Sequence, residues 1–201
     1  MQNFVKFFQW MAVVSLFFAC SESGNFYDNE MPDPITENGD ENARRMGHDE
    51  PVMVTVPFKA NFIGDYAGFL IGPDAECGAP FNCRVFVDFE GNGTHLGNFT
   101  GSFEFCACGP EGEYGPTISS MIAANGDILY VSCEGRVIPG REEDHPDHVT
   151  SYWRDPFVIL GGTGRFEGAT GGGMTDDYNS SEDPNSHHHW TGSITMVKGK
   201  R

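Results

Sequence analysis

Three side chains in this sequence are candidates for acid–base catalysis: His95, Asp65 and Glu134. Residues 94–106 alternate between apolar and polar side chains, and this alternation in a β-strand places His95 on the same face as the phenylalanines of that stretch. Such a histidine can act as an acid or base near neutral pH, or it can be a core residue that hydrogen-bonds to the backbone. Asp65 and Glu134 are the carboxylates that we expect beside it in a catalytic site. Spacing along the chain defines no Ser-His-Asp triad.

Two histidine-rich tracts are the candidates for binding a metal ion. They are residues 187–189, which are three consecutive histidines, and residues 144–148, Asp-His-Pro-Asp-His. Consecutive residues of a strand point to opposite faces, so at most His187 and His189 could share one ion. Both tracts follow acidic loops that contain proline, and we expect them to be solvated. The sequence therefore predicts no metal site and no cofactor.

Five of the six cysteines lie beyond residue 50: Cys77, Cys83, Cys106, Cys108 and Cys133. In an exported protein cysteines form disulfides where geometry allows, and an odd number leaves at least one of them without an intramolecular partner. Cys77 and Cys83 flank a short loop with glycine and proline, so we expect them to pair with each other. Cys106 or Cys108 is then a candidate partner for Cys133, although alternation places Cys106 and Cys133 on unlike faces of their strands.

The first 20 residues predict a bacterial lipoprotein signal. Lys6 precedes an apolar run of about 13 residues, which is too short to span a membrane and has the length of a signal-peptide core. The run ends in Leu-Phe-Phe-Ala-Cys, which resembles a lipobox except that Phe17 stands where leucine is usual. We therefore expect residues 1–19 to be removed as a signal peptide. Cys20 would then carry the acyl chains that hold the protein in a lipid membrane.

Residues 20–50 predict an acidic, disordered tether, because they are rich in Ser, Glu, Asn, Gly, Pro and Asp and poor in apolar side chains. The chain as a whole has 29 acidic and 12 basic residues and a net charge of −17. Nucleic-acid binding requires a cationic surface, so this charge excludes it. We expect a cell-envelope protein, anchored through Cys20 in the bacterial outer membrane and facing the periplasm or the cell surface.

Residues 51–198 predict an all-β domain. Apolar and polar side chains alternate in several stretches, and no stretch has the spacing of an amphipathic helix. In the last of them, residues 188–196, His188 and Trp190 fall on the apolar face. Asn-Gly pairs at 92–93 and 125–126 indicate tight hairpin turns. We expect about eight antiparallel strands closed into a barrel, since closure leaves no free edges; a two-sheet sandwich is the alternative.

Three glycine-rich stretches, residues 93–100, 123–127 and 161–171, resemble in order and spacing a widespread group of secreted bacterial proteins of unassigned function. The last stretch, Gly-Gly-Thr-Gly-Arg-Phe-Glu-Gly-Ala-Thr-Gly, also resembles a segment of plant dirigent proteins and of the related allene oxide cyclase barrel. The resemblance covers about residues 51–198. It implies an eight-stranded antiparallel barrel, and a homotrimer as in the plant relatives. It carries over no reaction, because no acid–base residue of those families matches a position here.

The leading functional hypothesis is that the barrel holds a small apolar or amphipathic ligand without turning it over. One alternative is a cyclase or isomerase that works in the cavity with His95, Asp65 or Glu134. A second alternative is a structural or interaction module at the cell surface, whose barrel is filled by its own aromatic side chains. Convergent histidine and carboxylate groups inside the barrel would favour an enzyme, and wholly apolar inward side chains would favour the module.

Overall fold

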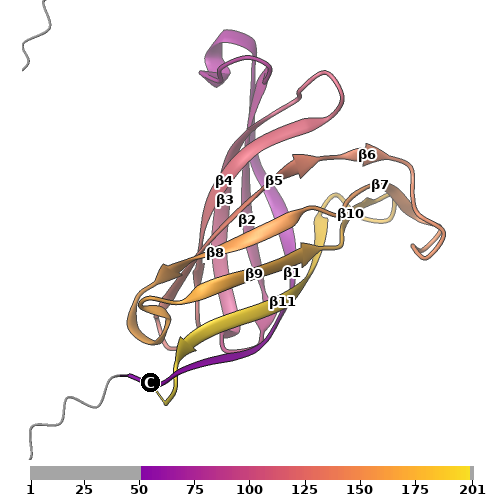
Figure 1. Ribbon diagram of the computed structural model, residues 1–201. Helices are drawn as coiled ribbons and strands as arrows, with labels where there is room; N and C mark the ends of the chain where they lie inside the picture. Colours follow the sequence, from indigo (N-terminus) through magenta and orange to yellow (C-terminus); the bar gives the residue numbers. More distant parts are fainter. Residues whose placement is uncertain (1–50, 200–201) are drawn as a thin grey trace, which may run out of the picture. The chain divides into compact units, whose positions relative to one another are not determined.

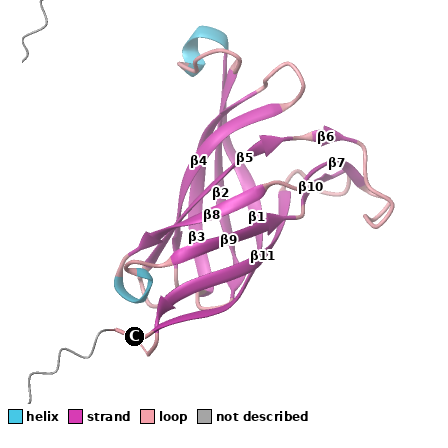
Figure 2. Cartoon of the chain, viewed as in Figure 1, coloured by secondary structure: helices cyan, strands magenta, loops and turns pink. Residues whose placement is uncertain are grey.

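The computed structural model describes residues 51–199, which form an all-β structure with two short 3-10 helices, η1 (Gly72–Ala75) and η2 (Gly164–Phe166) (Figure 2). Eleven strands make one antiparallel sheet. Their bounds are β1 (Met53–Ile71), β2 (Cys83–Gly93), β3 (Gly97–Ala107), β4 (Glu113–Ile122), β5 (Ile128–Arg136), β6 (Ile138–Pro139), β7 (Val149–Trp153), β8 (Pro156–Gly162), β9 (Thr170–Thr175), β10 (Asp177–Ser180) and β11 (Ser186–Val197). The signal peptide, Cys20 and the tether lie outside the described residues.

Eight of these strands close into a barrel, which confirms the predicted architecture (Figure 1). The order around it is β1-β2-β3-β4-β5-β8-β9-β11, and β11 pairs with β1 from Met53↔Val197 to Gly64↔Ser186. The sheet then continues beyond the barrel, because β10 pairs with the start of β11 and is followed by β7 and β6. This extension brings β10 next to the first residues of β11.

Aromatic side chains fill one end of the barrel, which we call the closed end. Phe62 packs against Phe89, Phe99 and Trp190, with ring centroids 5.1 to 5.7 Å apart. Phe166, which belongs to η2, is fully buried at this end. The burial of many aromatic rings in one cluster supplies much of the apolar area that stabilises a domain of this size. The opposite end, where η1 and the loop between β3 and β4 lie, is the mouth (Figure 1).

The Asn-Gly pair at 125–126 lies in the turn between β4 and β5, as predicted, but the pair at 92–93 still belongs to β2 and is paired with β3. Residues 94–96 form the turn between β2 and β3, and His95 has a φ of +66° there. Histidine tolerates this left-handed conformation better than most residues do. The expectation that a strand begins at Thr94 and places His95 with the phenylalanines is therefore wrong, since β3 begins at Gly97. Apolar and polar residues continue to alternate through residues 94–96, so the sequence pattern could not show that β3 begins only at Gly97.

Cys77 and Cys83 both form disulfides, but not with each other. Cys77 pairs with Cys106 and Cys83 with Cys108, at Cα separations of 5.8 and 5.5 Å. The reason is the register of the β2–β3 hairpin, which sets Cys83 opposite Ala107 and thus between the two later cysteines. Cys133 lies on β5, is buried and has no disulfide, so the expected pairing with Cys106 or Cys108 is also wrong.

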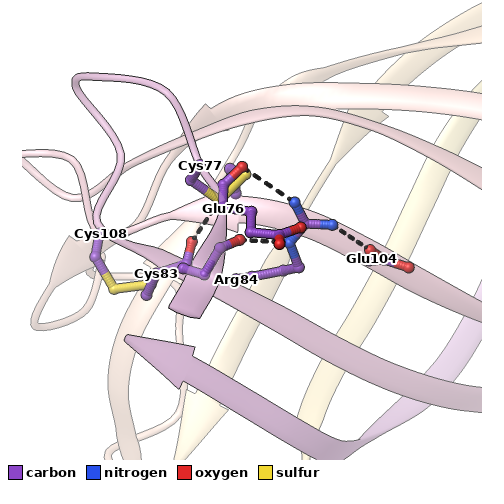
Figure 3. Close-up of a disulfide and its surroundings, with 8 residues drawn as sticks. Glu76, Cys77, Cys83, Arg84, Glu104 and Cys108 are labelled. Atoms are coloured by element: carbon purple, nitrogen blue, oxygen red, sulfur yellow. Dashed lines mark hydrogen bonds and ion pairs between the residues drawn. A yellow bond between two sulfur atoms is a disulfide. The ribbon is translucent and has the colours of Figure 1, made fainter. Parts of the chain in front are cut away.

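The Cys77–Cys106 disulfide fastens the loop after η1 to β3, and the Cys83–Cys108 disulfide joins the start of β2 to the residue that follows β3 (Figure 3). Arg84 strengthens this attachment from β2. Its Nε donates to the carbonyl oxygen of Ala75 at 2.7 Å, and its Nη1 forms an ion pair with Glu104 at 2.6 Å. The segments of β1, β2 and β3 nearest the mouth are thereby held as one unit.

Candidate functional site

A pocket of about 80 Å³ lies inside the barrel at the mouth, above the aromatic cluster. Most of its walls are aromatic or aliphatic, and its polar groups come from β1, β4, β10 and β11. The lining residues are Tyr66, Val87, Phe103, Phe105, Tyr114, Thr117, Cys133, Val137, Trp153, Asp177, Ser186, His188 and Trp190. Tyr66 is 45% exposed, so the pocket opens to solvent beside it.

A buried carboxylate, Asp177 of β10, lies against one wall of the pocket and is 1% exposed. The indole N–H of Trp190 donates to its Oδ2 at 3.0 Å, and the backbone N–H of His189 donates to its Oδ1 at 3.0 Å. A buried carboxylate needs such donors to offset the loss of water. The Nδ1 atom of His188 also lies 3.0 Å from Oδ2, although its N–H direction does not meet hydrogen-bond geometry. Asp177 is thus fixed in place next to an imidazole.

His188 is the buried histidine of the site. Its ring stacks on Phe62 at 4.4 Å with an interplanar angle of 6°, and Trp153 meets it edge-on at 5.8 Å. Its Nε2 atom lies 2.8 Å from the hydroxyl oxygen of Ser186, which precedes it by two residues on the same strand and the same face. Asp177, His188 and Ser186 therefore form a continuous polar array.

Gly64 of β1 makes room for this array. A β-carbon at position 64 would lie 2.5 Å from Ser186 Oγ and 3.2 Å from His188 Nε2. Gly64 is the residue that faces Ser186 across the β1–β11 pair. A side chain at this position would displace the serine hydroxyl, so the array depends on glycine here.

A second polar group lines the opposite side of the pocket. The hydroxyl of Tyr114 donates to Asp155 Oδ2 at 2.8 Å and lies 3.3 Å from Cys133 Sγ. Burial, followed by the neighbouring Cys133 and Asp155, raises the pKa of Tyr114 far above its ordinary value. Burial also raises the pKa of Cys133 to about 12 and raises the pKa of Asp155. Tyr114 and Cys133 consequently remain protonated at neutral pH.

Tyr66 stands between the array and solvent. Its hydroxyl donates to Asn179 Oδ1 at 3.0 Å. Burial raises the pKa of Tyr66, while hydrogen bonds with Asn179 and with Ser186 partly lower it. The tyrosine hydroxyl is therefore a proton donor next to Ser186 at the entrance of the pocket.

The side chains predicted from the sequence do not come together in the structure. His95 lies in the β2–β3 turn at the closed end, where its Nε2 is 3.2 Å from the carbonyl oxygen of Pro57. Asp65 and Glu134 are exposed and do not line the pocket. The expectation that these carboxylates lie beside His95 is wrong. The side chains of Asp65 and Glu134 both point out of the barrel, because each occupies an outward-facing position of its strand.

The histidine that lines the pocket is His188, which the sequence pattern placed on the apolar face of the last strand. Alternation put His188 with Trp190, and both are buried in the pocket wall. The expectation that both histidine tracts are solvated is wrong for His188, which is 6% exposed, and for His145, which is 8% exposed. Asp177 had no signal of its own, because only the β10–β11 pairing brings it to His188. Ser186 was within reach of the alternation argument, since it shares a strand and a face with His188 two residues later.

No group of three or more His, Cys, Asp or Glu residues within 51–199 is arranged to hold a metal ion. In the same part of the chain no helix is long and apolar enough to cross a membrane. A comparison of the chain with known protein families, curated proteins and solved structures finds no match.

Proposed function

We propose that the barrel binds a small amphipathic molecule in the pocket at its mouth. The observation that carries this proposal is the buried array of Asp177, His188 and Ser186 on the wall of an otherwise apolar pocket. Burying three polar side chains costs folding free energy that their hydrogen bonds only partly offset, and apolar pockets with a few convergent polar groups are the usual form of small-molecule sites. Phe103, Phe105 and the other apolar walls would contact the ligand body.

The size of the pocket limits what it can enclose. A cavity of 150 Å³ holds a molecule such as benzene, and this pocket has about 80 Å³. The enclosed part of the ligand therefore has only a few non-hydrogen atoms. The remainder would extend past Tyr66 and Val137 toward solvent, because the aromatic cluster fills the closed end.

A second candidate function is acid–base catalysis of the cyclase or isomerase type. The convergence of His188 with Asp177 inside the barrel favours it over a purely structural module. In this case His188 takes the role that the sequence suggested for His95, with Asp177 in place of Asp65 and Glu134.

The lipoprotein signal supports a place in the cell envelope, with Cys20 as the membrane anchor. The likeness of residues 161–171 to dirigent proteins supports assembly as a homotrimer. The membrane anchor and the homotrimer are parts of this proposal, and they concern the location and assembly of the protein rather than the chemistry of the pocket.

Tryptophan fluorescence tests the binding proposal directly. The chain has three tryptophans; Trp10 belongs to the predicted signal peptide, and Trp153 and Trp190 both line the pocket. In the exported protein, emission should therefore report on the pocket alone. We expect a saturable change on titration with small amphipathic alcohols, phenols or esters.

A pair of variants locates the binding. Val137→Phe narrows the mouth and should abolish the fluorescence response. Ile118→Phe adds a phenylalanine to the outer face of β4, where Ile118 is 70% exposed, and should leave the response intact. Loss of the response in both variants, or in neither, would place binding elsewhere.

A further inference from the structure

The geometry points to a hydrolytic activity: we propose that the pocket cleaves small acyl esters, with Ser186 as the nucleophile and His188 as its general base. This inference rests on the proposed function, since the ester is the small amphipathic molecule that the pocket would admit. It goes further by assigning a reaction and by naming the atom that attacks.

The distances along the array are those of a nucleophile, a base and an orienting carboxylate. Ser186 Oγ lies 2.8 Å from Nε2 of His188, and Nδ1 of the same ring lies 3.0 Å from Asp177 Oδ2. Nε2 of the imidazole is engaged by Ser186, and Nδ1 faces the carboxylate of Asp177 without a hydrogen bond. His188 can act on a bound molecule only through the hydroxyl of Ser186, which favours nucleophilic attack over direct proton exchange.

Each member of the array is held by contacts outside it. Asp177 accepts hydrogen bonds from Trp190 and from the backbone of His189, and it serves as a positioning residue. Phe62 fixes the plane of the His188 ring by stacking. The Nδ1 atom of His188 lies 3.0 Å from Asp177 Oδ2 without hydrogen-bond alignment. Such hydrogen bonds commonly tighten only when substrate is bound.

Tyr66 supplies a donor for the negative charge that develops on the acyl oxygen. Its hydroxyl donates to Asn179 Oδ1 at 3.0 Å, and Tyr66 lines the same pocket as Ser186. A carbonyl oxygen held next to Ser186 can replace Asn179 as the acceptor of that proton. Donors aimed at the developing oxyanion are a large source of rate enhancement in acyl transfer.

The reaction proceeds in two balanced steps. Ser186 Oγ bonds to the acyl carbon while its proton passes to His188 Nε2, and the bond between the acyl carbon and the alcohol oxygen breaks as the alcohol takes that proton. Water then attacks the acyl carbon, gives a proton to His188, and Ser186 leaves with the proton that His188 returns. The products are the carboxylic acid and the alcohol, and the enzyme is regenerated.

The pocket volume selects a short acyl group. An acetyl group has few enough non-hydrogen atoms for a pocket of about 80 Å³, and the alcohol would extend past Tyr66 and Val137. We therefore take p-nitrophenyl acetate as the substrate probe and a small alkyl fluorophosphonate as the covalent probe. With the latter, a bond forms between Ser186 Oγ and phosphorus, the phosphorus–fluorine bond breaks, and the proton passes to His188.

The test uses the exported full chain and intact-mass and peptide-mass measurements after fluorophosphonate treatment. We expect one adduct, mapped to Ser186, and hydrolysis of p-nitrophenyl acetate that falls at least about a thousand-fold in Ser186→Ala. Ser119→Ala is the matched control, because Ser119 is fully buried on β4, donates to the carbonyl oxygen of Ser102 and does not line the pocket. This control should keep both the adduct and the hydrolysis.

Labelling of the unaltered protein keeps the test independent of whether a variant folds. If p-nitrophenol changes the tryptophan emission but no adduct forms and no ester is cleaved, the hydrolytic inference is overturned and the binding proposal stands. If neither a fluorescence response nor an adduct is seen, both are overturned. An adduct on a residue other than Ser186 also overturns the assignment.

Discussion

Ser186 Oγ lies 2.8 Å from Nε2 of His188, two residues further along the same strand, inside a pocket that is otherwise mainly apolar. The contact arises because residues i and i+2 of a strand share a face, and β11 turns this face into the barrel. The carboxylate of Asp177 reaches the other ring nitrogen from β10, which pairs with the start of β11. A short segment of sheet thus assembles the array.

Gly64→Ala should damage the pocket without changing any polar residue. The added β-carbon would lie 2.5 Å from Ser186 Oγ and 2.7 Å from Val87 Cγ1, so one of them must move. We expect a loss of about 1–3 kcal/mol in the free energy of unfolding and a weaker fluorescence response to ligand. Chemical denaturation measures the first. Gly78→Ala, where a β-carbon meets nothing within 4 Å, is the control and should leave both properties unchanged.

Asp177→Asn should separate turnover from binding. The amide keeps the shape of the side chain but removes the charge that stabilises a protonated His188. We expect the rate of p-nitrophenyl acetate hydrolysis to fall by at least about a hundred-fold, while the affinity for p-nitrophenol changes little. Steady-state kinetics and tryptophan fluorescence give the two quantities. An equal loss of affinity and rate would indicate that Asp177 only supports the fold.

Tyr66→Phe removes the donor at the entrance of the pocket. If Tyr66 stabilises the oxyanion, formation of the acyl enzyme should slow by about 10²- to 10³-fold. Binding of p-nitrophenol should persist because the aromatic ring remains. Tyr130→Phe is the control, since Tyr130 does not line the pocket. Similar rates for the two variants would show that Tyr66 plays no part in the reaction.

Cys133 should be unreactive in the folded protein. Burial raises the pKa of its thiol from 9.0 to about 12, so the thiolate is scarce at neutral pH. Because the folded form holds the proton more tightly, this group contributes stability below pH 9 that is lost as the pH rises toward 12. A thiol reagent should label the native protein slowly and the unfolded protein fast. The loss of stability above pH 9 should be smaller in Cys133→Ala.

The two disulfides should contribute to stability independently of Cys133. Each closes a loop in the unfolded chain, with sequence separations of 29 and 25 residues. Replacing both Cys77 and Cys106 with serine should cost about 2–4 kcal/mol of unfolding free energy. Peptide mapping of the unreduced protein should recover Cys77 linked to Cys106. A peptide that links Cys77 to Cys83 would contradict this pairing.

The barrel could be predicted from the sequence, because alternation and Asn-Gly turns are local signals of antiparallel strands. The inward direction of His188 was equally accessible, since its parity matches that of Trp190. The ends of strands were not: alternation continued into the turn at His95 and placed it wrongly among the phenylalanines. The position of His95 is set by the conformation of the turn, and that conformation depends on how β2 and β3 pair.

Apart from Ser186 and His188, which strand alternation places on one face, the site could not be predicted, because its other parts meet through strand register. Asp177 reaches His188 only through the pairing of β10 with β11, and Gly64 faces Ser186 only through the pairing of β1 with β11. The disulfides follow the same logic, since the β2–β3 register set Cys83 between Cys106 and Cys108. These relationships link distant residues, and one sequence contains no direct sign of them.

Native mass spectrometry of the protein isolated from the envelope of its own host tests the central claim, that the pocket holds a small molecule. We expect an additional organic mass on the folded protein that is released by mild denaturation and is absent from Val137→Phe, whose pocket entrance is narrowed. Bare protein in both samples, with tryptophan emission that no small amphipathic molecule alters, would contradict the claim.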